Sequence, residues 1–431
     1  MSDALIEDVF GRIEDSKEDL AELALALGNT YGPVGHEEPT ARRVHEWYVD
    51  NGMEADFVPM IEDRASVVGR VRGDGTGRSV IFNAHLDTEA SGHDYDTLMN
   101  APDPNRVGAR REGDHIIGHT VQNDRGCMSV QMIAGRAIQQ AKAPLLGDIL
   151  LKSAAGETGA APVDEYQGLR YESKGLGTTW LLERGYRADY AVIAETTDFS
   201  ASWVQCGASY FKVTLRGRNM YTPRLERPGA LQDHPNAIVR AAAAIQAIEE
   251  WAVGSEARRR TETSCGTMSP KAQVGAMRGG IPWRPNRSST YAALYVDVRT
   301  LPGEDVTPLQ RELTDVVRTV DPNATVECFM SKPGYGASDE EIAPLIDTIR
   351  AAHEQVRGEP MPTRAETAVV SMWRDTNVYN RVGIPSLTFG PSRGNASVQG
   401  TGSMELGNMI EGAKIYALTA MRLCGAVDAA V

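Results

Sequence analysis

Four short segments of the chain contain side chains that bind divalent metal ions. The segments are Asn83-Ala84-His85-Leu86-Asp87, Asn123-Asp124, Gly156-Glu157 and Ala194-Glu195. One imidazole and several carboxylates form a hard-to-borderline ligand set that suits zinc, manganese or cobalt. Asp87, two residues after His85, could accept the second imidazole N–H and fix the tautomer of that ligand. Four such segments together favour a common metal site over four unrelated turns.

Short apolar runs that are typical of buried strands precede these residues. They lie at 79–82, 149–151 and 190–193, and a further run lies at 386–389. A helical pattern from Cys127 to about Ala141 separates the first two. Strands that alternate with helices imply right-handed crossovers and a mainly parallel sheet. Ligands gather at the carboxyl ends of such strands, which is where the candidate metal ligands fall.

The middle of the chain has a different pattern. Residues 211–215 and 290–298 alternate with a period of two, and 237–251 has helical spacing. Half-polar strands around a helix fit a small α+β unit with one solvated sheet face. Because 431 residues exceed what one core usually organises, we expect two domains. The expected fold class is α/β: a mainly parallel-sheet metallohydrolase domain at 1–208 and 327–431, with an α+β domain inserted at 209–326.

Composition and charge disfavour several classes of partner. Hydrophobic residues make up 42% of the chain and charged residues 24%, as in ordinary globular proteins. The 58 acidic residues outnumber the 44 basic ones, and the formal charge of -14 disfavours nucleic acid and anionic membranes as partners. No apolar run reaches the roughly 20 residues of a membrane helix, and the N-terminus lacks a signal core. The 5 cysteines lie far apart and fit reduced thiols, so we expect a cytoplasmic protein.

The order and spacing of the four segments resemble those of the aminoacylase, carboxypeptidase-G and acetylornithine deacetylase family of metallopeptidases. Asp297-Val298-Arg299, Gly383-Ile384-Pro385 and Phe389-Gly390-Pro391 extend the resemblance over essentially the whole chain. The resemblance implies that His85, Asp124 and Glu195 bind a catalytic metal and that Glu157 is the general base. It also implies that the inserted domain is a dimerisation or lid domain, and therefore a homodimer or a larger homo-oligomer.

The chain departs from this family at the second metal. The second glutamate of the family's Glu-Glu pair is Thr158 here, and no histidine follows His353, although the family places a metal-binding histidine near the C-terminus. Both private ligands of a second metal are thus absent, and we expect one divalent transition metal per chain: manganese, zinc or cobalt. In the other possible alignment, Glu157 is the second-metal ligand and Gly156 stands in the place of the base.

A third departure concerns the reaction. Tyr221 stands where the family has a histidine that stabilises the oxyanion of amide hydrolysis, and His234 is an alternative donor. Preorganised donors of this kind contribute roughly 3–4 kcal/mol. Their loss suits a substrate that stabilises its own developing charge, such as an aromatic amine with an electron-withdrawing nitro group. The expected activity is that of an aminohydrolase, in which metal-activated water displaces the amine and releases ammonia.

The expected substrate also carries a carboxylate. Arg284, Arg287 and Arg299, with Asn286 close by in the sequence, could bind it, since a guanidinium binds a carboxylate with two hydrogen bonds. Arg299 follows a predicted strand and is the best placed of the three.

Two other functions remain open. The first is a one-metal N-acyl amino acid deacylase or dipeptidase in which Tyr221 replaces the histidine donor. The second is an inactive ligand-binding scaffold. Retention of the metal-site residues together, at His85, Asp87, Asp124, Glu157 and Glu195, disfavours the scaffold.

Overall fold

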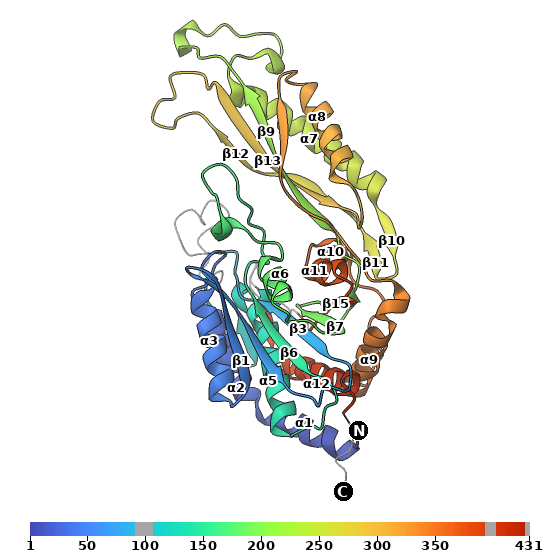
Figure 1. Ribbon diagram of the computed structural model, residues 1–431. Coiled ribbons are helices and arrows are strands. Elements are labelled where there is room, and N and C mark those ends of the chain that lie inside the picture. Colours follow the sequence, from blue (N-terminus) through green and yellow to red (C-terminus); the bar gives the residue numbers. More distant parts are fainter. Residues whose placement is uncertain (91–106, 393–401, 427–431) are drawn as a thin grey trace. The chain divides into compact units, whose positions relative to one another are not determined.

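The computed structural model describes residues 1–90, 107–392 and 402–426, which form two compact units. The first unit comprises Met1–Val204, Gly336–Ala365 and Arg374–Val431. The inserted unit comprises Gln205–Tyr335 and Glu366–Trp373. Figure 1 shows the helices and strands of both units.

A seven-stranded mixed sheet forms the centre of the first unit, with the strand order β1-β2-β6-β3-β7-β15-β8 (Figure 1). The strands span Glu54–Ile61 (β1), Arg64–Val71 (β2), Val80–His85 (β3), Ile149–Ala154 (β6), Tyr190–Ala194 (β7), Ala201–Ser202 (β8) and Ser386–Phe389 (β15). β6, β3, β7 and β15 run parallel, whereas β1, β2 and β8 pair antiparallel at the two edges. The four apolar runs predicted from the sequence are the four parallel strands, each buried at every position. The predicted α/β fold is therefore confirmed, and the antiparallel edges make the sheet mixed.

Helices pack around this sheet. In the first unit they span Asp3–Asp15 (α1), Lys17–Gly28 (α2), Glu38–Asp50 (α3), Gly126–Gln140 (α5), Leu176–Glu183 (α6), Asp339–Arg357 (α9), Thr376–Arg381 (α11) and Leu406–Leu423 (α12). A short π-helical turn at Val121–Arg125 (η3) leads directly into α5 and carries Asp124. α5 is buried along nearly its whole length, where it packs against α12, α1 and α2. Gly135 lets α5 lie against β6 of the sheet, because a Cβ atom there would lie 2.3 Å from the side chain of Leu151.

A small three-stranded sheet also belongs to the first unit. Its strands are Arg110–Glu112 (β4), His115–Ile117 (β5) and Ser403–Glu405 (β16), in the order β16-β5-β4. Because β16 pairs with β5, the sheet joins the start of α12 to the segment just before η3.

A network of buried polar groups lies under the central strands of the first unit. The carboxylate of Asp375 accepts hydrogen bonds from Asn83 Nδ2 at 3.0 Å and from Thr178 Oγ1 at 2.5 Å. Lys152 on β6 donates to the carbonyl oxygen of Tyr186 at 2.7 Å and lies 5.1 Å from the centre of the Tyr379 ring. Burial lowers the pKa of Lys152 to about 7, although the charge of Asp375 opposes this shift.

We expect the substitution Lys152→Met to flatten the pH dependence of the thermal unfolding temperature. The unfolded chain keeps the lysine proton up to its ordinary pKa of 10.5, whereas the folded chain releases it at about 7. Between these values the unfolded state binds more protons, so stability rises with pH, and below about pH 7 the full cost of the buried charge applies. Melting curves of both proteins from about pH 6 to about pH 10 measure the slopes.

Lys142→Met is the matched control, because Lys142 is an exposed lysine of the same unit. It should keep the wild-type slope. A Lys152→Met protein with that same slope would contradict the prediction.

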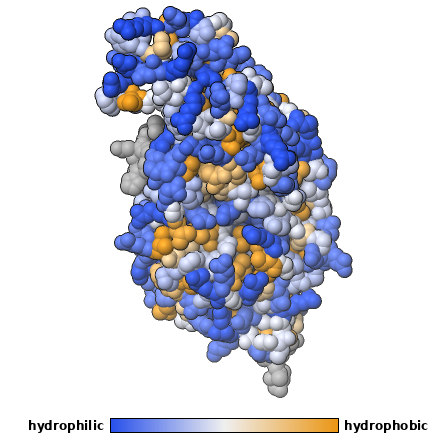
Figure 2. Space-filling model, turned by 45° about the horizontal axis from the view of Figure 1, so that its top comes forward, coloured by the Kyte–Doolittle hydropathy of each residue, from blue (hydrophilic) through white to orange (hydrophobic). Residues whose placement is uncertain are grey.

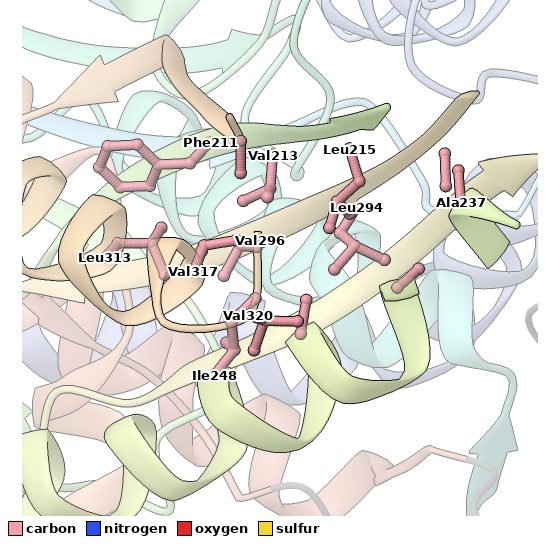
Figure 3. Packing of buried hydrophobic residues seen from close by; sticks show 14 of the residues in the cluster. Phe211, Val213, Leu215, Ala237, Ile248, Leu294, Val296, Leu313, Val317 and Val320 are labelled. Atoms are coloured by element: carbon pink, nitrogen blue, oxygen red, sulfur yellow. The ribbon is translucent and has the colours of Figure 1, made fainter. Parts of the chain in front are cut away.

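The inserted unit is an antiparallel sheet covered by two helices. Its strands are Gly207–Arg216 (β9), Ala272–Gly279 (β12), Tyr291–Thr300 (β13) and Thr325–Lys332 (β14), in the order β12-β13-β9-β14. The helices are Ala237–Arg259 (α7) and Val306–Arg318 (α8). Figure 3 shows their apolar side chains, including Ile248 and Leu313, packed against Phe211, Leu294 and Val296 of the sheet. The alternating strands expected from the sequence are β9 and β13, which bury every second residue or more.

The limits of the inserted unit differ from the expected 209–326. The unit runs from Gln205 to Tyr335 because β9 begins at Gly207 and β14 continues to Lys332. It also includes Glu366–Trp373, a segment far away in the sequence that contains the helix Thr367–Ser371 (α10). α10 packs against the hairpin formed by Thr261–Thr263 (β10) and Gly266–Met268 (β11), where Ser371 Oγ accepts a hydrogen bond from the backbone N–H of Ser269 at 2.8 Å.

Among the residues described, no helix combines the length and the apolar character needed to cross a membrane. Most of the surface seen in Figure 2 is hydrophilic, with smaller hydrophobic patches between the polar residues.

Candidate metal centre

Three parallel strands bring candidate metal-binding side chains together. His85 is the last residue of β3, Glu195 directly follows β7, and Glu157 lies three residues after β6. One ligand atom of each residue lies within 4.8 Å of the corresponding atoms of the other two, and all three residues are buried. The carboxyl ends of neighbouring parallel strands meet at one edge of a sheet, so strand order alone explains this convergence.

The ring of His85 is held by hydrogen bonds at both nitrogens. Its Nδ1 lies 2.9 Å from the backbone carbonyl oxygen of Asp87, and its Nε2 lies 3.2 Å from Asn123 Oδ1. Both oxygens only accept hydrogen bonds, so both ring nitrogens carry protons in this arrangement, and a metal ion would take the place of the proton on Nε2 while Nδ1 stays bound to Asp87. Burial lowers the pKa of His85, but the charges of Asp87, Asp124 and Glu157 outweigh burial and raise it to about 9.

The carboxylate of Asp87 has a different partner from the one that the sequence predicts. It lies 3.8 Å from His85 Nδ1, and the backbone carbonyl of Asp87 takes the imidazole hydrogen bond instead. The carboxylate accepts hydrogen bonds from the backbone N–H of Glu157 at 3.0 Å and from the N–H and the hydroxyl of Thr158 at 2.8 and 2.6 Å. Asp87 therefore fixes the turn that carries Glu157.

This turn also requires Gly156. Its φ of +73° lies in the left-handed region that favours glycine, and a Cβ atom there would lie 2.5 Å from Arg64 Nη2. Arg64 is itself buried and pairs with Glu37. The glycine before Glu157 thus has a structural explanation.

Asp124 lies beside His85 but outside the group of three ligand atoms. Its Oδ2 accepts a hydrogen bond from the backbone N–H of His85 at 3.2 Å. Its Oδ1 is buried with no hydrogen-bond partner among the described residues. Burial raises the pKa of Asp124 to about 7, although the charge of His85 opposes the shift. A buried carboxylate oxygen without a partner is costly, and a bound cation would remove that cost, so the residues present fit a divalent metal.

Two buried arginines belong to the site, and sequence reasoning missed both. Arg374 forms an ion pair with Glu195, and both side chains are buried. Arg125 donates to the backbone carbonyls of Leu86, Leu27, Thr30 and Gly32, which fixes the segment between His85 and Asp87. An arginine is normally exposed to solvent, so neither residue carries a sequence signal beyond its position next to Asp124 or Asp375.

The residues predicted to bind substrate lie in the inserted unit, and three of them come together. Tyr221 forms a β-bridge with Arg287, whose guanidinium lies 5.7 Å from the centre of the Tyr221 ring. Arg284 and Arg287 line a pocket of about 630 Å³ next to β12 and β13. Arg299 lies eight residues beyond Tyr291 on β13, about 26 Å along an extended strand. There it pairs with Asp297 at 2.8 Å, so it does not share a carboxylate site with the other two arginines.

The remaining predicted positions add less to the site. His234 is buried before α7, where its Nδ1 accepts a hydrogen bond from the backbone N–H of Asn236 at 3.1 Å. Asn236 caps that helix, and the backbone carbonyl of Asn286 accepts from Thr222. In the segment where the family places a histidine near the C-terminus, residues 397–401 lie outside the described residues.

Comparison with known proteins shows what this chain is similar to. Residues 206–325 match the family model described as a peptidase dimerisation domain. Two curated relatives are named N-formyl-4-amino-5-aminomethyl-2-methylpyrimidine deformylase. The one from Bacillus subtilis is 26% identical over 196 residues, so the match spans 43% of this chain and 41% of the relative. The one from Halalkalibacterium halodurans is 21% identical over 421 residues, 90% of this chain and 91% of the relative.

Solved structures extend the likeness to the whole fold. Human carnosine dipeptidase 1 superposes with a TM-score of 0.71 at 14% identity, over 97% of this chain and 99% of that one. A dinuclear metal-binding peptidase of the M20 family from Bacillus subtilis superposes with a TM-score of 0.56 at 12% identity, over 96% and 100%. The chain has the fold of the M20 metallopeptidases. The inserted domain expected from the motif resemblance is thus confirmed as the M20 dimerisation domain.

From this M20 dimerisation domain we expect a homodimer or a larger homo-oligomer. β12 is an edge strand that is largely exposed and carries Met277, and the unpaired backbone groups of such an edge can pair with another chain. Light scattering at micromolar concentration should give at least twice the chain mass of 46.7 kDa. A monomer that retains full activity would refute this expectation.

Proposed function

We propose that this M20-fold protein is a one-metal aminohydrolase that converts 5-nitroanthranilate and water into 5-nitrosalicylate and ammonia. The observation that carries the proposal is a ligand set with fewer carboxylates than a two-metal site needs. His85, Glu157 and Glu195 converge, while Thr158 turns its hydroxyl to Asp87 instead of offering a second carboxylate. The departures from the family pattern also resemble those of 5-nitroanthranilate aminohydrolase, an enzyme of the same family.

In this proposal His85, Asp124 and Glu195 hold the metal. The carbonyl of Asp87 holds Nδ1 of His85, which leaves Nε2 to bind the metal in place of its proton, and Oδ1 of Asp124 has no hydrogen-bond partner among the described residues. A divalent cation held there supplies Lewis acidity and makes water a stronger acid. Three protein ligands without a bridged second ion hold it weakly, so mild chelation should remove it.

Glu157 is the proposed general base. Its carboxylate is buried among the metal-binding side chains, and Asp87 fixes its backbone through the N–H groups of Glu157 and Thr158. Glu157 takes a proton from the attacking water as the new C–O bond forms at the amine-bearing ring carbon. The C–N bond then breaks, and the proton held by Glu157 passes to the nitrogen, which leaves as ammonia. The ring and its nitro group hold the negative charge between these two events.

The substrate carboxylate needs cationic donors, and we propose Arg284 and Arg287 for this role. Both line one pocket, and Arg287 lies against the ring of Tyr221, so an anion in that pocket could meet two guanidinium groups. Arg299, best placed by sequence, pairs with Asp297 and is the weaker candidate.

Amide hydrolysis is the second candidate function, because the curated relatives are named as deformylases. In that reading Tyr221 donates to the oxyanion in place of the family's histidine. A panel of 5-nitroanthranilate, an N-formyl amine, an N-acetyl amino acid and a dipeptide distinguishes the two functions. The manganese-loaded protein should release ammonia from 5-nitroanthranilate, and His85→Ala should not.

Two other outcomes of the panel would favour a different function. Formate or acetate release without ammonia would replace the aminohydrolase by a one-metal deacylase. Binding of a panel compound without any product would favour the ligand-binding scaffold.

A further inference from the structure

Arg374 is a buried cation among the proposed metal ligands. Its Nη1 pairs with Oε2 of Glu195, and the relative exposures of the two side chains are 8% and 4%. The guanidinium thus directly neutralises one of the proposed metal ligands.

The residue after Arg374 is fixed by hydrogen bonds to buried side chains. Asp375 is fully buried and accepts hydrogen bonds from Asn83 on β3 and from Thr178 on α6. Because β3 also ends in His85, the same strand that presents the imidazole positions the residue after Arg374. The guanidinium is therefore held by the same elements as the proposed metal ligands.

Thr158 affects the charge of the same centre. A carboxylate at this position would add a negative charge beside Glu157, whereas the neutral threonine donates a hydrogen bond from its hydroxyl to Asp87 at 2.6 Å. Replacing a divalent ion by a guanidinium removes one positive charge, and having threonine instead of glutamate removes one negative charge. The net charge of the centre is then the same as that of a two-metal site.

We propose that the Arg374 guanidinium serves as the second cation of the centre: it neutralises Glu195, a ligand of the single metal, and keeps the centre mononuclear. The inference rests on the proposed one-metal hydrolase. Arginine suits this role because it stays charged at every accessible pH and its planar N–H groups fit a carboxylate. A permanent cation there also repels a divalent ion and competes with it for Glu195, so it sets the affinity for the single metal.

Metal binding without substrate tests this proposal. Zn²⁺ and Mn²⁺ are titrated into the chelator-stripped protein against a fluorescent chelator, and metal per chain is measured by elemental analysis. Wild type should bind one ion, and Arg374→Met and Arg374→Gln should each bind that ion at least about tenfold more tightly, because a nearby positive charge is gone. Arg374→Lys keeps the charge and should keep the wild-type affinity, as should Arg350→Met, which removes an exposed arginine on α9.

A second variant tests the replacement directly. The double substitution Thr158→Glu with Arg374→Gln restores a carboxylate and removes the guanidinium, so it should bind two ions per chain. Two ions in wild type would overturn the proposal. So would unchanged or weaker affinity in both Arg374→Met and Arg374→Gln when their circular dichroism matches wild type. These readouts need no turnover, so a protein inactive on 5-nitroanthranilate would end the proposed function and leave the metal test intact.

Discussion

The substitution Glu157→Gln is expected to lower kcat on 5-nitroanthranilate by about 10²–10⁴-fold, the usual contribution of general-base catalysis. Glutamine keeps the shape of the side chain and the backbone N–H that donates to Asp87, but it cannot take a proton. The fold and the metal content should therefore stay at wild-type values. Ammonia release under saturating substrate measures kcat, and elemental analysis measures the metal.

Glu183→Gln is the matched control, because Glu183 is exposed at the end of α6 and should leave both readouts unchanged. The two readouts separate the roles open to Glu157, whose ligand atom lies within 4.8 Å of those of His85 and Glu195. An unimpaired Glu157→Gln enzyme would place the base at another residue. Loss of metal together with rate would make Glu157 a ligand and leave Gly156 in the position of the base.

Removing the nitro group from the substrate is expected to lower turnover as much as removing a hydrogen-bond donor to the oxyanion does. Anthranilate should bind through the same carboxylate contacts, yet its turnover should fall by at least about 10²–10³-fold, the size of effect seen when one oxyanion donor is lost. The reason is that the proposed centre has one metal and Tyr221 in place of the family's histidine, so the ring must hold the charge. Ammonia release from the two substrates measures the ratio, and inhibition by anthranilate measures its binding.

Comparable turnover of the two substrates would rule out ring-stabilised charge. Failure of anthranilate to inhibit would instead attribute the loss to binding, and would assign the nitro group a role in recognition.

The parts of the site that sequence predicts are those that lie on strand ends. His85, Glu157 and Glu195 follow continuous apolar runs, and such runs indicate both a buried strand and the edge where it ends. The antiparallel strands β1 and β2 have no comparable run, since charged residues such as Glu54, Asp56 and Arg70 interrupt them. Their place at the sheet edge follows from tertiary pairing and was not predicted.

The contacts that sequence does not predict are those made by loops. The two-residue spacing of His85 and Asp87 suggested that the carboxylate orients the imidazole, but the backbone carbonyl is 2.9 Å away and does so instead. Burial of Arg374 beside Glu195 depends on two segments 179 positions apart meeting at one sheet edge. The spacing of apolar residues predicts helices and strands. It does not predict which loops come together or whether an arginine in a loop is buried.

The division into units has a practical consequence for truncation. The chain passes between the units four times, at 204/205, 335/336, 365/366 and 373/374. At the first two passages Val204 bridges Gly336, and the backbone N–H of Gln205 donates to the carbonyl of Tyr335, so a short loop could join Val204 to Gly336. The other two enclose α10 and lead directly into Arg374. A stand-alone first unit therefore requires two excisions, and the second ends at the arginine that pairs with Glu195.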